Sequence, residues 1–481
     1  MKSWLHRSRI SPFVSMTVAE RVALVGLLAL MGFMTMPFAI AAEASSRLLL
    51  YGGFVAYLFA LSVPFIFRQW TPGVFHPLVF YVVWVGIQGL LRGEMALPVT
   101  GLDYHRALSG SAALDLNALV AESFLLDAAA LVFLYTGYLL APNFRVPRLA
   151  VPVARWPAVK SIIWLGIAGL GVVMLATIGG GLDQVLMQRG IASDQRIGAQ
   201  VGGQWGFLAG TGVVAPLVWL VCDRRAVRNP LFWAILAAAL VIKFAATGSR
   251  GGAIVPLIII GAVYVLQSRN IPYSVVLTGI IVALVLVGGL GQYRQATMDA
   301  ENLGGVAVQG GPMQWMGQAV NEMEGGAGEN NGQLAVLGKV PTQVPYLLGE
   351  SYLSIPFVFV PSAVWGDKPD AAGKLNATRV YGNPLNAIPP KAVGEAYWNF
   401  SYVGVVFVFM LYGASLKALA AMFRANSNHP IILVLFVYVL FYLQPHTPSI
   451  YGFFHAAVPA VFILLSFLVR VDGRMRFQDP A

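Results

Sequence analysis

Long apolar runs recur along almost the whole chain and constrain its fold more than any other feature. A helix that crosses a bilayer needs about 20 predominantly apolar residues. Since 58% of the residues are hydrophobic and only 11% are charged, against about 25% charged in soluble domains, the chain could not cover a water-facing surface of its own size. We expect an all-α polytopic membrane protein with about twelve transmembrane helices. The predicted spans are residues 21–42, 47–67, 74–91, 118–141, 159–179, 204–222, 230–247, 251–267, 272–291, 396–416, 430–446 and 449–470.

Positive charge falls on every second connection between these spans. One set of connections comprises Arg68, Arg269, the C-terminal tail and residues 1–21, 142–160, 223–229 and 417–429. It holds 18 of the 31 Lys and Arg residues but only 4 of the 21 Asp and Glu residues. Because cytoplasmic loops carry an excess of Lys and Arg, both termini are expected in the cytoplasm. Topology therefore explains the net charge of +10, and no nucleic-acid partner is expected.

The first apolar run resembles the core of a secretory signal peptide, but residues 22–42 exceed the usual length of about 7–15 residues. We expect an uncleaved first spanning helix.

The largest connection, residues 292–395, lies on the extracytoplasmic side and divides the chain into three parts. Residues 1–291 hold the first nine predicted helices, and residues 396–481 hold the last three and a cytoplasmic tail. The connection is rich in Gly, Pro and Asn, with short apolar pieces at 312–316 and 354–364. Because irregular backbone at membrane depth must be shielded by protein or line a wet cavity, this loop is expected to carry short helices and fold back onto the bundle as a lid.

A glycine-rich turn, Thr-Gly-Ser-Arg-Gly-Gly at 247–252, separates two predicted spans on the outer side. Glycines let the backbone approach a ligand closely, and the N-terminus of the following helix offers free N–H groups to an anion. The guanidinium of Arg250 adds a fork that matches phosphate. Two readings stay open: a phosphate site, and a hairpin turn with an interfacial arginine.

The large loop also carries cations, against the topological bias. They are Arg294, Lys368, Lys374, Arg379 and Lys391. As a group they fit either a negatively charged ligand at the membrane surface or solvated loop charge, and for each one alone solvated loop charge is the favoured reading. With one cysteine and no HExxH, Walker or GxSxG motif, the chain predicts no metal, no cofactor and no ATP-driven transport.

Glu395 is the most informative carboxylate, because it lies at the predicted lip of a span, in Gly-Glu-Ala-Tyr-Trp-Asn-Phe at 394–400. A carboxylate at an apolar boundary suits a general base, but a charge at a helix N-terminus is also stabilised by the macrodipole. Its neighbours Tyr397 and Trp398 fit either an interfacial aromatic belt or a surface that stacks on sugar rings.

Three ionisable residues lie within predicted spans, where such residues are functional candidates. Glu122 and Lys243 are at similar depth, so we expect either that they pair or that Lys243 reaches the interface. Asp127 is deeper, and the sequence suggests no partner for it. His446, in the outer hairpin 444–449, fits a proton relay or an ordinary turn residue.

Three stretches together resemble the bacterial Wzy-type oligosaccharide repeat-unit polymerases, which are relatives of the O-antigen ligases. They are Thr-Gly-Ser-Arg-Gly at 247–251, Val-Pro-Ser-Ala-Val-Trp-Gly-Asp-Lys-Pro at 360–369, and the stretch 394–400 followed by Gly404. Their order and the placement of the last two around one large outer loop also match, and the predicted topology extends the likeness over nearly the whole chain.

The resemblance implies a GT-C-like glycosyltransferase of the bacterial inner membrane, with the large loop in the periplasm. It would move a growing chain from undecaprenyl pyrophosphate onto the non-reducing end of a new lipid-linked repeat, as in lipopolysaccharide O-antigen or exopolysaccharide biosynthesis. The implied partners are the undecaprenyl-pyrophosphate-linked oligosaccharide, membrane lipid and a chain-length regulator protein.

This reaction needs cations for the departing pyrophosphate and a base for the acceptor hydroxyl. The candidate phosphate-binding residues are Arg250, Arg294, Arg379, Lys391 and Lys368. The candidate bases are Glu395 first, then Asp367 and Glu350, and the candidate substrate contacts are Tyr397, Trp398 and His446. Two alternatives stay open: an O-antigen ligase with a lipid A acceptor, and a flippase or secondary transporter.

Overall fold

The computed structural model of the chain describes its helical parts and their nearest connections. The described residues are 13, 16–41, 44–66, 73–83, 116–152, 156–181, 185, 203–247, 250–269, 279, 281–282, 284–286, 288–293, 296, 310–317, 332–357, 365, 369–383, 387–442, 461–468 and 477–478. This part is helical almost throughout, as the composition predicts.

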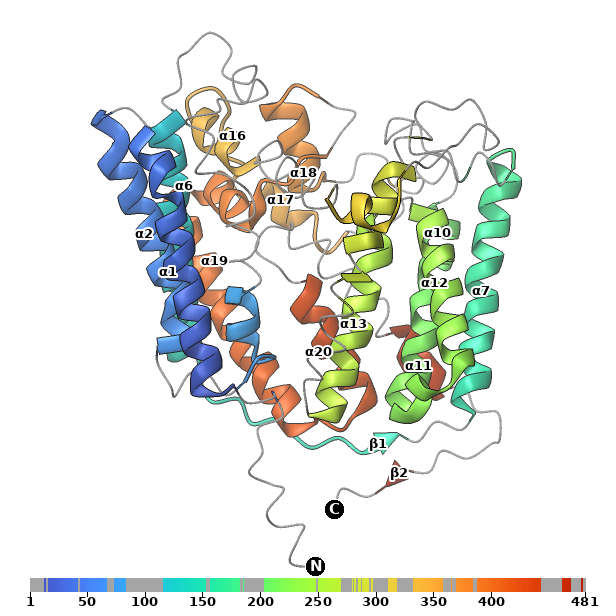
Figure 1. Cartoon of the computed structure of the whole chain (residues 1–481). Coiled ribbons are helices and arrows are strands. Elements are labelled where there is room, and N and C mark those ends of the chain that lie inside the picture. Colours follow the sequence, from blue (N-terminus) through green and yellow to red (C-terminus); the bar gives the residue numbers. More distant parts are fainter. Residues whose placement is uncertain are drawn as a thin grey trace, which may run out of the picture. The chain divides into compact units, whose positions relative to one another are not determined.

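Four helices in the described part are long and apolar enough to cross a membrane (Figure 1). They lie in α2 (Ala44–Ile66), α6 (Leu116–Leu140), α7 (Pro157–Ile178) and α19 (Lys391–Ala425). They coincide with the predicted spans 47–67, 118–141, 159–179 and 396–416. Shorter apolar helices lie at Leu208–Cys222, Pro230–Ala246, Val255–Ser268, Leu284–Tyr293 and Pro430–Tyr442.

Large apolar side chains are exposed along these long helices. Leu170 and Val173 on α7 are 54% and 57% exposed, and Phe407 and Leu411 on α19 are 69% and 70% exposed. Soluble monomers rarely expose contiguous apolar surface on this scale, whereas lipid is a suitable solvent for it. The chain is therefore a helical membrane protein. The total number of crossings stays a prediction.

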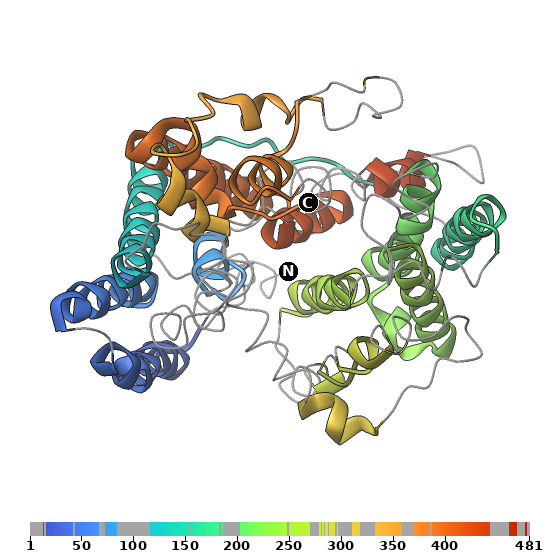
Figure 2. The same cartoon turned by 90° about the horizontal axis from the view of Figure 1, so that it is seen from above.

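The chain forms two compact units. The first comprises Met1–Val146, Met323–Ala425 and Val439–Phe454. Its described helices are α1 (Val18–Ala41), α2, α6, α16 (Gly332–Lys339), α17 (Glu350–Leu353), α18 (Ala372–Leu375), the π-helical turn η8 (Asn376–Val380) and α19. Within this unit α6 packs against α2 on one side and α19 on the other, and α16 packs against both α6 and α19 (Figure 2).

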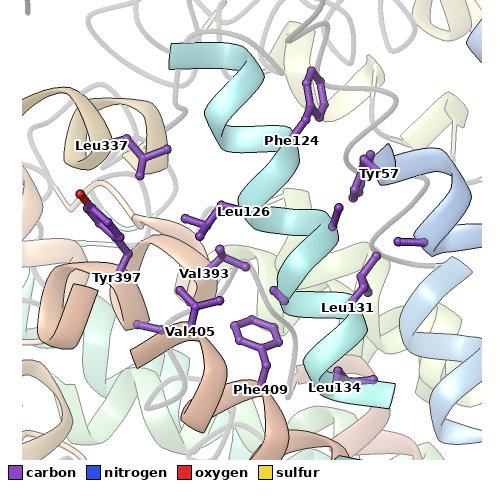
Figure 3. Packing of buried hydrophobic residues seen from close by; sticks show 14 of the residues in the cluster. Tyr57, Phe124, Leu126, Leu131, Leu134, Leu337, Val393, Tyr397, Val405 and Phe409 are labelled. Carbon is purple, nitrogen blue, oxygen red and sulfur yellow. The ribbon is translucent and has the colours of Figure 1, made fainter. Parts of the chain in front are cut away.

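Glycines allow these helices to approach closely. A Cβ added at Gly137 of α6 would overlap the carbonyl of Met410 on α19, and one added at Gly413 would overlap the carbonyl of Leu134. Small residues at helix crossings are how membrane helices gain contact area. Around this crossing lies the apolar core, in which Leu126 of α6 lies between side chains from α16 and α19 (Figure 3).

The helix α19 consists of two arms, because its backbone leaves the helical conformation at Phe400 (φ −141°) and Ser401 (φ 58°). We call residues 391–399 the short arm and residues 402–425 the long arm. A Cβ added at Gly404 would overlap the carbonyl oxygen of Ala396, although eight residues of straight helix span about 12 Å. The short arm therefore folds back along the start of the long arm.

The second unit comprises Pro147–Glu322, Asn426–Tyr438 and His455–Ala481. Its elements are α7, α10 (Gly203–Gly210), η5 (Thr211–Val213), α11 (Val214–Cys222), η6 (Arg224–Arg228), α12 (Pro230–Thr247), α13 (Arg250–Ser268) and the two-residue antiparallel strands β1 (Val151–Pro152) and β2 (Phe477–Gln478). The chain continues from α19 into α20 (Pro430–Tyr442). Residues 312–317 are helical, where the sequence predicts a short interfacial helix.

Candidate functional site

The short arm of α19 places Glu395 inside the first unit. The Glu395 side chain is only 3% exposed, and its Oε1 accepts a hydrogen bond of 2.8 Å from Oγ of Ser351 on α17. Asn399, one turn further along the short arm, donates through Nδ2 to the same Ser351 Oγ at 2.8 Å and to the backbone oxygen of Glu395 at 2.8 Å. The buried carboxylate thus accepts from Ser351, whose hydroxyl is in turn held by Asn399.

The reversal of α19 would leave the last carbonyls of the short arm without helical partners. The loop before α17 supplies them, because N–H of Leu347 donates to the Trp398 oxygen at 3.0 Å and N–H of Leu348 to the Asn399 oxygen at 3.2 Å. N–H of Gly349 donates to Oδ1 of Asn399 at 2.9 Å. Residues 347–351 therefore cap the short arm and cover Glu395 at the same time.

Both ends of the short arm hold a residue in the left-handed region, Lys391 and Ser401, each with φ of 58°. Neither is glycine, so each such conformation costs on the order of 1–3 kcal/mol. Strain of this kind persists only where the surrounding structure imposes it, and it clusters at functional sites.

A second polar cluster lies beside the short arm, on α6. Nε2 of Gln333 donates to Oδ1 of Asp127 at 2.9 Å and to Oγ of Ser123 at 3.0 Å. Nζ of Lys391 lies 3.8 Å from Oδ2 of Asp127, and both side chains are nearly buried. Asp127 lies about 16 Å along α6 from its start, at roughly 1.5 Å per residue, which is near the middle of this 25-residue helix. Asp127, for which the sequence suggests no partner, thus binds two.

Because Lys391 and Glu395 are four positions apart, they share one face of the short arm. The buried charges here are one cation, Lys391, and two carboxylates, Asp127 and Glu395. Ionisable groups at such depth are costly and mark functional sites.

Two buried amide oxygens near this cluster have no hydrogen-bond partner in the described part of the chain: Oε1 of Gln333 and Oδ1 of Asn376. The hydrogen bonds of the two amide nitrogens fix how each side-chain amide is oriented. Nε2 of Gln333 donates to a carboxylate, and Nδ2 of Asn376 donates to the carbonyl of Ile388 at 2.9 Å. Unpaired buried acceptors are rare, so the cluster can accept hydrogen bonds from a further donor such as a hydroxyl or water.

Glu350 and Arg379 form a bidentate ion pair at the more exposed edge of the site. The guanidinium donates through Nη1 to Oε2 at 2.7 Å and through Nη2 to Oε1 at 2.6 Å. The two side chains are 37% and 41% exposed. The pair joins the first residue of α17 to η8. Glu350, a candidate base, and Arg379, a candidate phosphate ligand, therefore bind each other.

Tyr352 of α17 lies next to the buried carboxylate. Burial raises the pKa of its phenol well above the ordinary value, and the negative charge of Glu395 raises that pKa further. Its ring stacks on Phe400 with centroids 6.3 Å apart. Tyr352 therefore stays a neutral hydrogen-bond donor at physiological pH.

The two aromatic residues predicted to stack on sugars lie in the core. The Trp398 side chain is 0% exposed and its Nε1 donates to the oxygen of Pro345 at 3.1 Å. Tyr397 is 5% exposed and its hydroxyl donates to the oxygen of Val340 at 3.4 Å. Both rings are packed inside the first unit in this structure. The roles expected for them, a sugar contact or an interfacial belt, stay predictions.

The expected pairing of Glu122 with Lys243 stays a prediction. Glu122 accepts a hydrogen bond of 2.6 Å from the hydroxyl of Tyr402, at the start of the long arm. Lys243 belongs to the second unit, where its Nζ lies beside Gly210.

Several predicted site residues lie outside the described residues: Arg294, Asp367, Lys368 and His446. Arg250 is the first residue of α13, so a helix begins at the glycine-rich turn as predicted. Only the backbone of Arg250 is described.

The residues that the sequence did not single out are Ser123, Gln333, Ser351, Asn376 and Asn399. Only Asn399 had a local signal that could have identified it, because it follows Glu395 by one helical turn. In the described part of the chain no group of three or more His, Cys, Asp and Glu side chains is arranged to hold a metal ion.

Comparisons of the chain with protein-family models, curated proteins and solved structures find no match.

Proposed function

We propose that the protein is a glycosyltransferase that polymerises undecaprenyl-pyrophosphate-linked oligosaccharide repeat units at the outer face of the bacterial inner membrane. The observation that carries the proposal is Glu395, a buried carboxylate that accepts from Ser351 on a folded-back helix of a membrane protein, with Asn399 holding the Ser351 hydroxyl. Buried carboxylates in membrane proteins mark functional sites, and proton transfer is one of the roles they serve. The three motif stretches that resemble repeat-unit polymerases support the same function.

In the proposed reaction the acceptor hydroxyl attacks the anomeric carbon of the lipid-linked donor. The new glycosidic bond forms, the bond to the pyrophosphate oxygen breaks, and the hydroxyl proton passes to the Glu395 carboxylate. The leaving lipid pyrophosphate takes the negative charge, and Arg379 is the candidate cation for it in the first unit. Arg250 and Arg294, which belong to the second unit, stay candidates from the sequence alone. Fixed cations at developing phosphate charge act by electrostatic stabilisation.

The structure supports a different role for Lys391 from the predicted phosphate contact. Its ammonium is nearly buried beside Asp127, so we assign it to balancing the charge of that carboxylate. Glu350, one of the two reserve candidate bases, is engaged by Arg379. The other, Asp367, lies outside the described residues, and Glu395 remains the first candidate and the proposed base.

A transporter of lipid-linked oligosaccharides is the second candidate, because one observation favours it. Transporters bind substrates near the bilayer midplane on broken helices. The helix α19 is broken at Phe400 and Ser401, and the first residue of its short arm, Lys391, pairs with the deep residue Asp127. An O-antigen ligase uses the same donor with another acceptor and shares the proposed chemistry.

A polysaccharide gel on a deletion strain distinguishes the three. Single repeats in place of a ladder, restored by the wild-type gene, indicate the polymerase. Loss of all attached glycan with persisting long lipid-linked chains indicates the ligase. Unpolymerised units that accumulate inside the cell indicate the transporter and refute the proposed function.

A further inference from the structure

The Glu350–Arg379 pair has the geometry of an occupied anion site. A guanidinium fork binds a carboxylate and a phosphate through the same two parallel hydrogen bonds, and here both are made at 2.6 and 2.7 Å. The side chains are 41% and 37% exposed, so a ligand can reach the guanidinium. Arg379 also stands on a π-helical turn, η8, a feature often found at functional sites.

The same pair fixes the element that covers the proposed base. Glu350 is the first residue of α17, and the next residue, Ser351, is 1% exposed and donates to Glu395. Tyr352 follows it against Phe400. With Glu395 only 3% exposed, an acceptor hydroxyl reaches it only if a covering element shifts, and α17 is the element whose side chain bonds the carboxylate. Releasing Glu350 from Arg379 removes the one ion pair that joins α17 to η8 in the described part of the chain.

We propose that the carboxylate of Glu350 is a resident occupant of an anion site on Arg379, and that a pyrophosphate-bearing ligand displaces it and frees α17 from above Glu395. This inference rests on the proposed function for its ligand. It differs from a simple phosphate contact, because it makes Glu350 a competitor of the ligand. Donor binding would then uncover the base only when a pyrophosphate is present.

The direction of the Glu350→Gln effect tests the competition. Binding of radiolabelled inorganic pyrophosphate is measured on the purified full chain in phosphatidylcholine nanodiscs. Glu350→Gln keeps the shape of the side chain and removes its charge, so pyrophosphate should bind up to about fivefold more tightly, the factor that matches the strongest exposed ion pairs. Arg379→Gln should weaken binding about tenfold or more, and Arg145→Gln, an exposed arginine elsewhere in the unit, should leave it unchanged.

Weaker binding in both Glu350→Gln and Arg379→Gln would mean that Glu350 braces the arginine, and would overturn the proposal. Unchanged binding in both would show that the pair is only structural. Nanodiscs with phosphatidylglycerol separate the ligand sources: equal pyrophosphate binding in both lipids supports a pyrophosphate site. Loss of binding in the anionic lipid would assign the site to lipid headgroups and contradict the pyrophosphate assignment.

Carbodiimide labelling of Glu395, read by mass spectrometry, tests the movement of α17. Labelling should rise on addition of pyrophosphate and be high without it in Glu350→Gln. Labelling that stays at the wild-type ligand-free level in both cases would refute the uncovering of Glu395. Neither readout depends on polymerisation. A chain that passes both tests but makes no polymer disproves the proposed function alone, whereas a chain that polymerises but fails them disproves this inference alone.

Discussion

Replacing Gly404 with alanine tests the fold-back that places Glu395. An added Cβ would overlap the backbone oxygen of Ala396 and lie 2.9 Å from Cβ of Phe400. Backbone cannot rotate away as a side-chain end can, so the two arms of α19 must separate. Overpacking of this kind costs about 1–3 kcal/mol. A displacement on the order of 1 Å at a reacting group can also cost about 100-fold in rate, so activity should fall more than stability.

The matched control is Gly261→Ala in α13, where no atom lies within 4 Å of an added Cβ. Alanine in that open position should stabilise the protein by about 0.4–1 kcal/mol, because it restricts the unfolded chain. Thermal unfolding of both variants in detergent, together with the length of the polysaccharide ladder in cells, compares the two sites. Equal stability and equal ladders for Gly404→Ala and Gly261→Ala would refute the fold-back of the short arm.

Two further predictions concern charge. Asp127→Asn should destabilise the protein by about 2–3 kcal/mol, because it leaves the buried ammonium of Lys391 unbalanced; the loss is smaller than for a close pair, since Lys391 Nζ is 3.8 Å away. Adding Lys391→Met should recover much of this loss of stability, measured by chemical denaturation. A double variant no more stable than Asp127→Asn would count against the pair. Burial lowers the pKa of His429, partly offset by a hydrogen bond to Ala150, while its Nδ1 accepts from N–H of Ile432. Its folded pKa lies below the unfolded value of about 6.5, so the stability it contributes is present above that pH and is lost as pH falls through the folded pKa. His429→Asn keeps an N-cap acceptor and should flatten the melting temperature between about pH 7 and pH 5; an unchanged slope would exclude His429 as the cause.

The helical membrane character followed from the sequence because apolar length and charge are local properties. Residues 118–141 were predicted within two residues of α6. Glu395 was also accessible to local reasoning, since it is a lone carboxylate in an apolar stretch that becomes helical. What this reasoning could not reach was the reversal after it. The chain turns at Phe400 and Ser401 without glycine or proline, so no typical turn residue marks the point. Only Gly404, where the two arms of α19 come into contact, is a residue type that the reversal requires.

The partners of the site residues were beyond prediction for another reason. Gln333 and Asp127 are 206 positions apart, so their contact depends on how α16 packs on α6 and not on any local pattern. Trp398 gives a second example. An aromatic residue beside a predicted span boundary suggests an interfacial belt, and no local pattern indicates that the backbone oxygen of Pro345, 53 positions away, accepts its N–H.

The most direct test of the central claim is the polysaccharide ladder of a deletion strain that carries Glu395→Gln. Glutamine keeps the size of the side chain and an acceptor for Ser351 but cannot take the proton of the acceptor hydroxyl. Glu20→Gln is the control, because glutamine preserves the capping box in which Glu20 accepts from N–H of Thr17. At equal protein levels in the membrane, we predict single repeats for Glu395→Gln and a full ladder for Glu20→Gln. A full ladder from Glu395→Gln would contradict the assignment of Glu395 as the base.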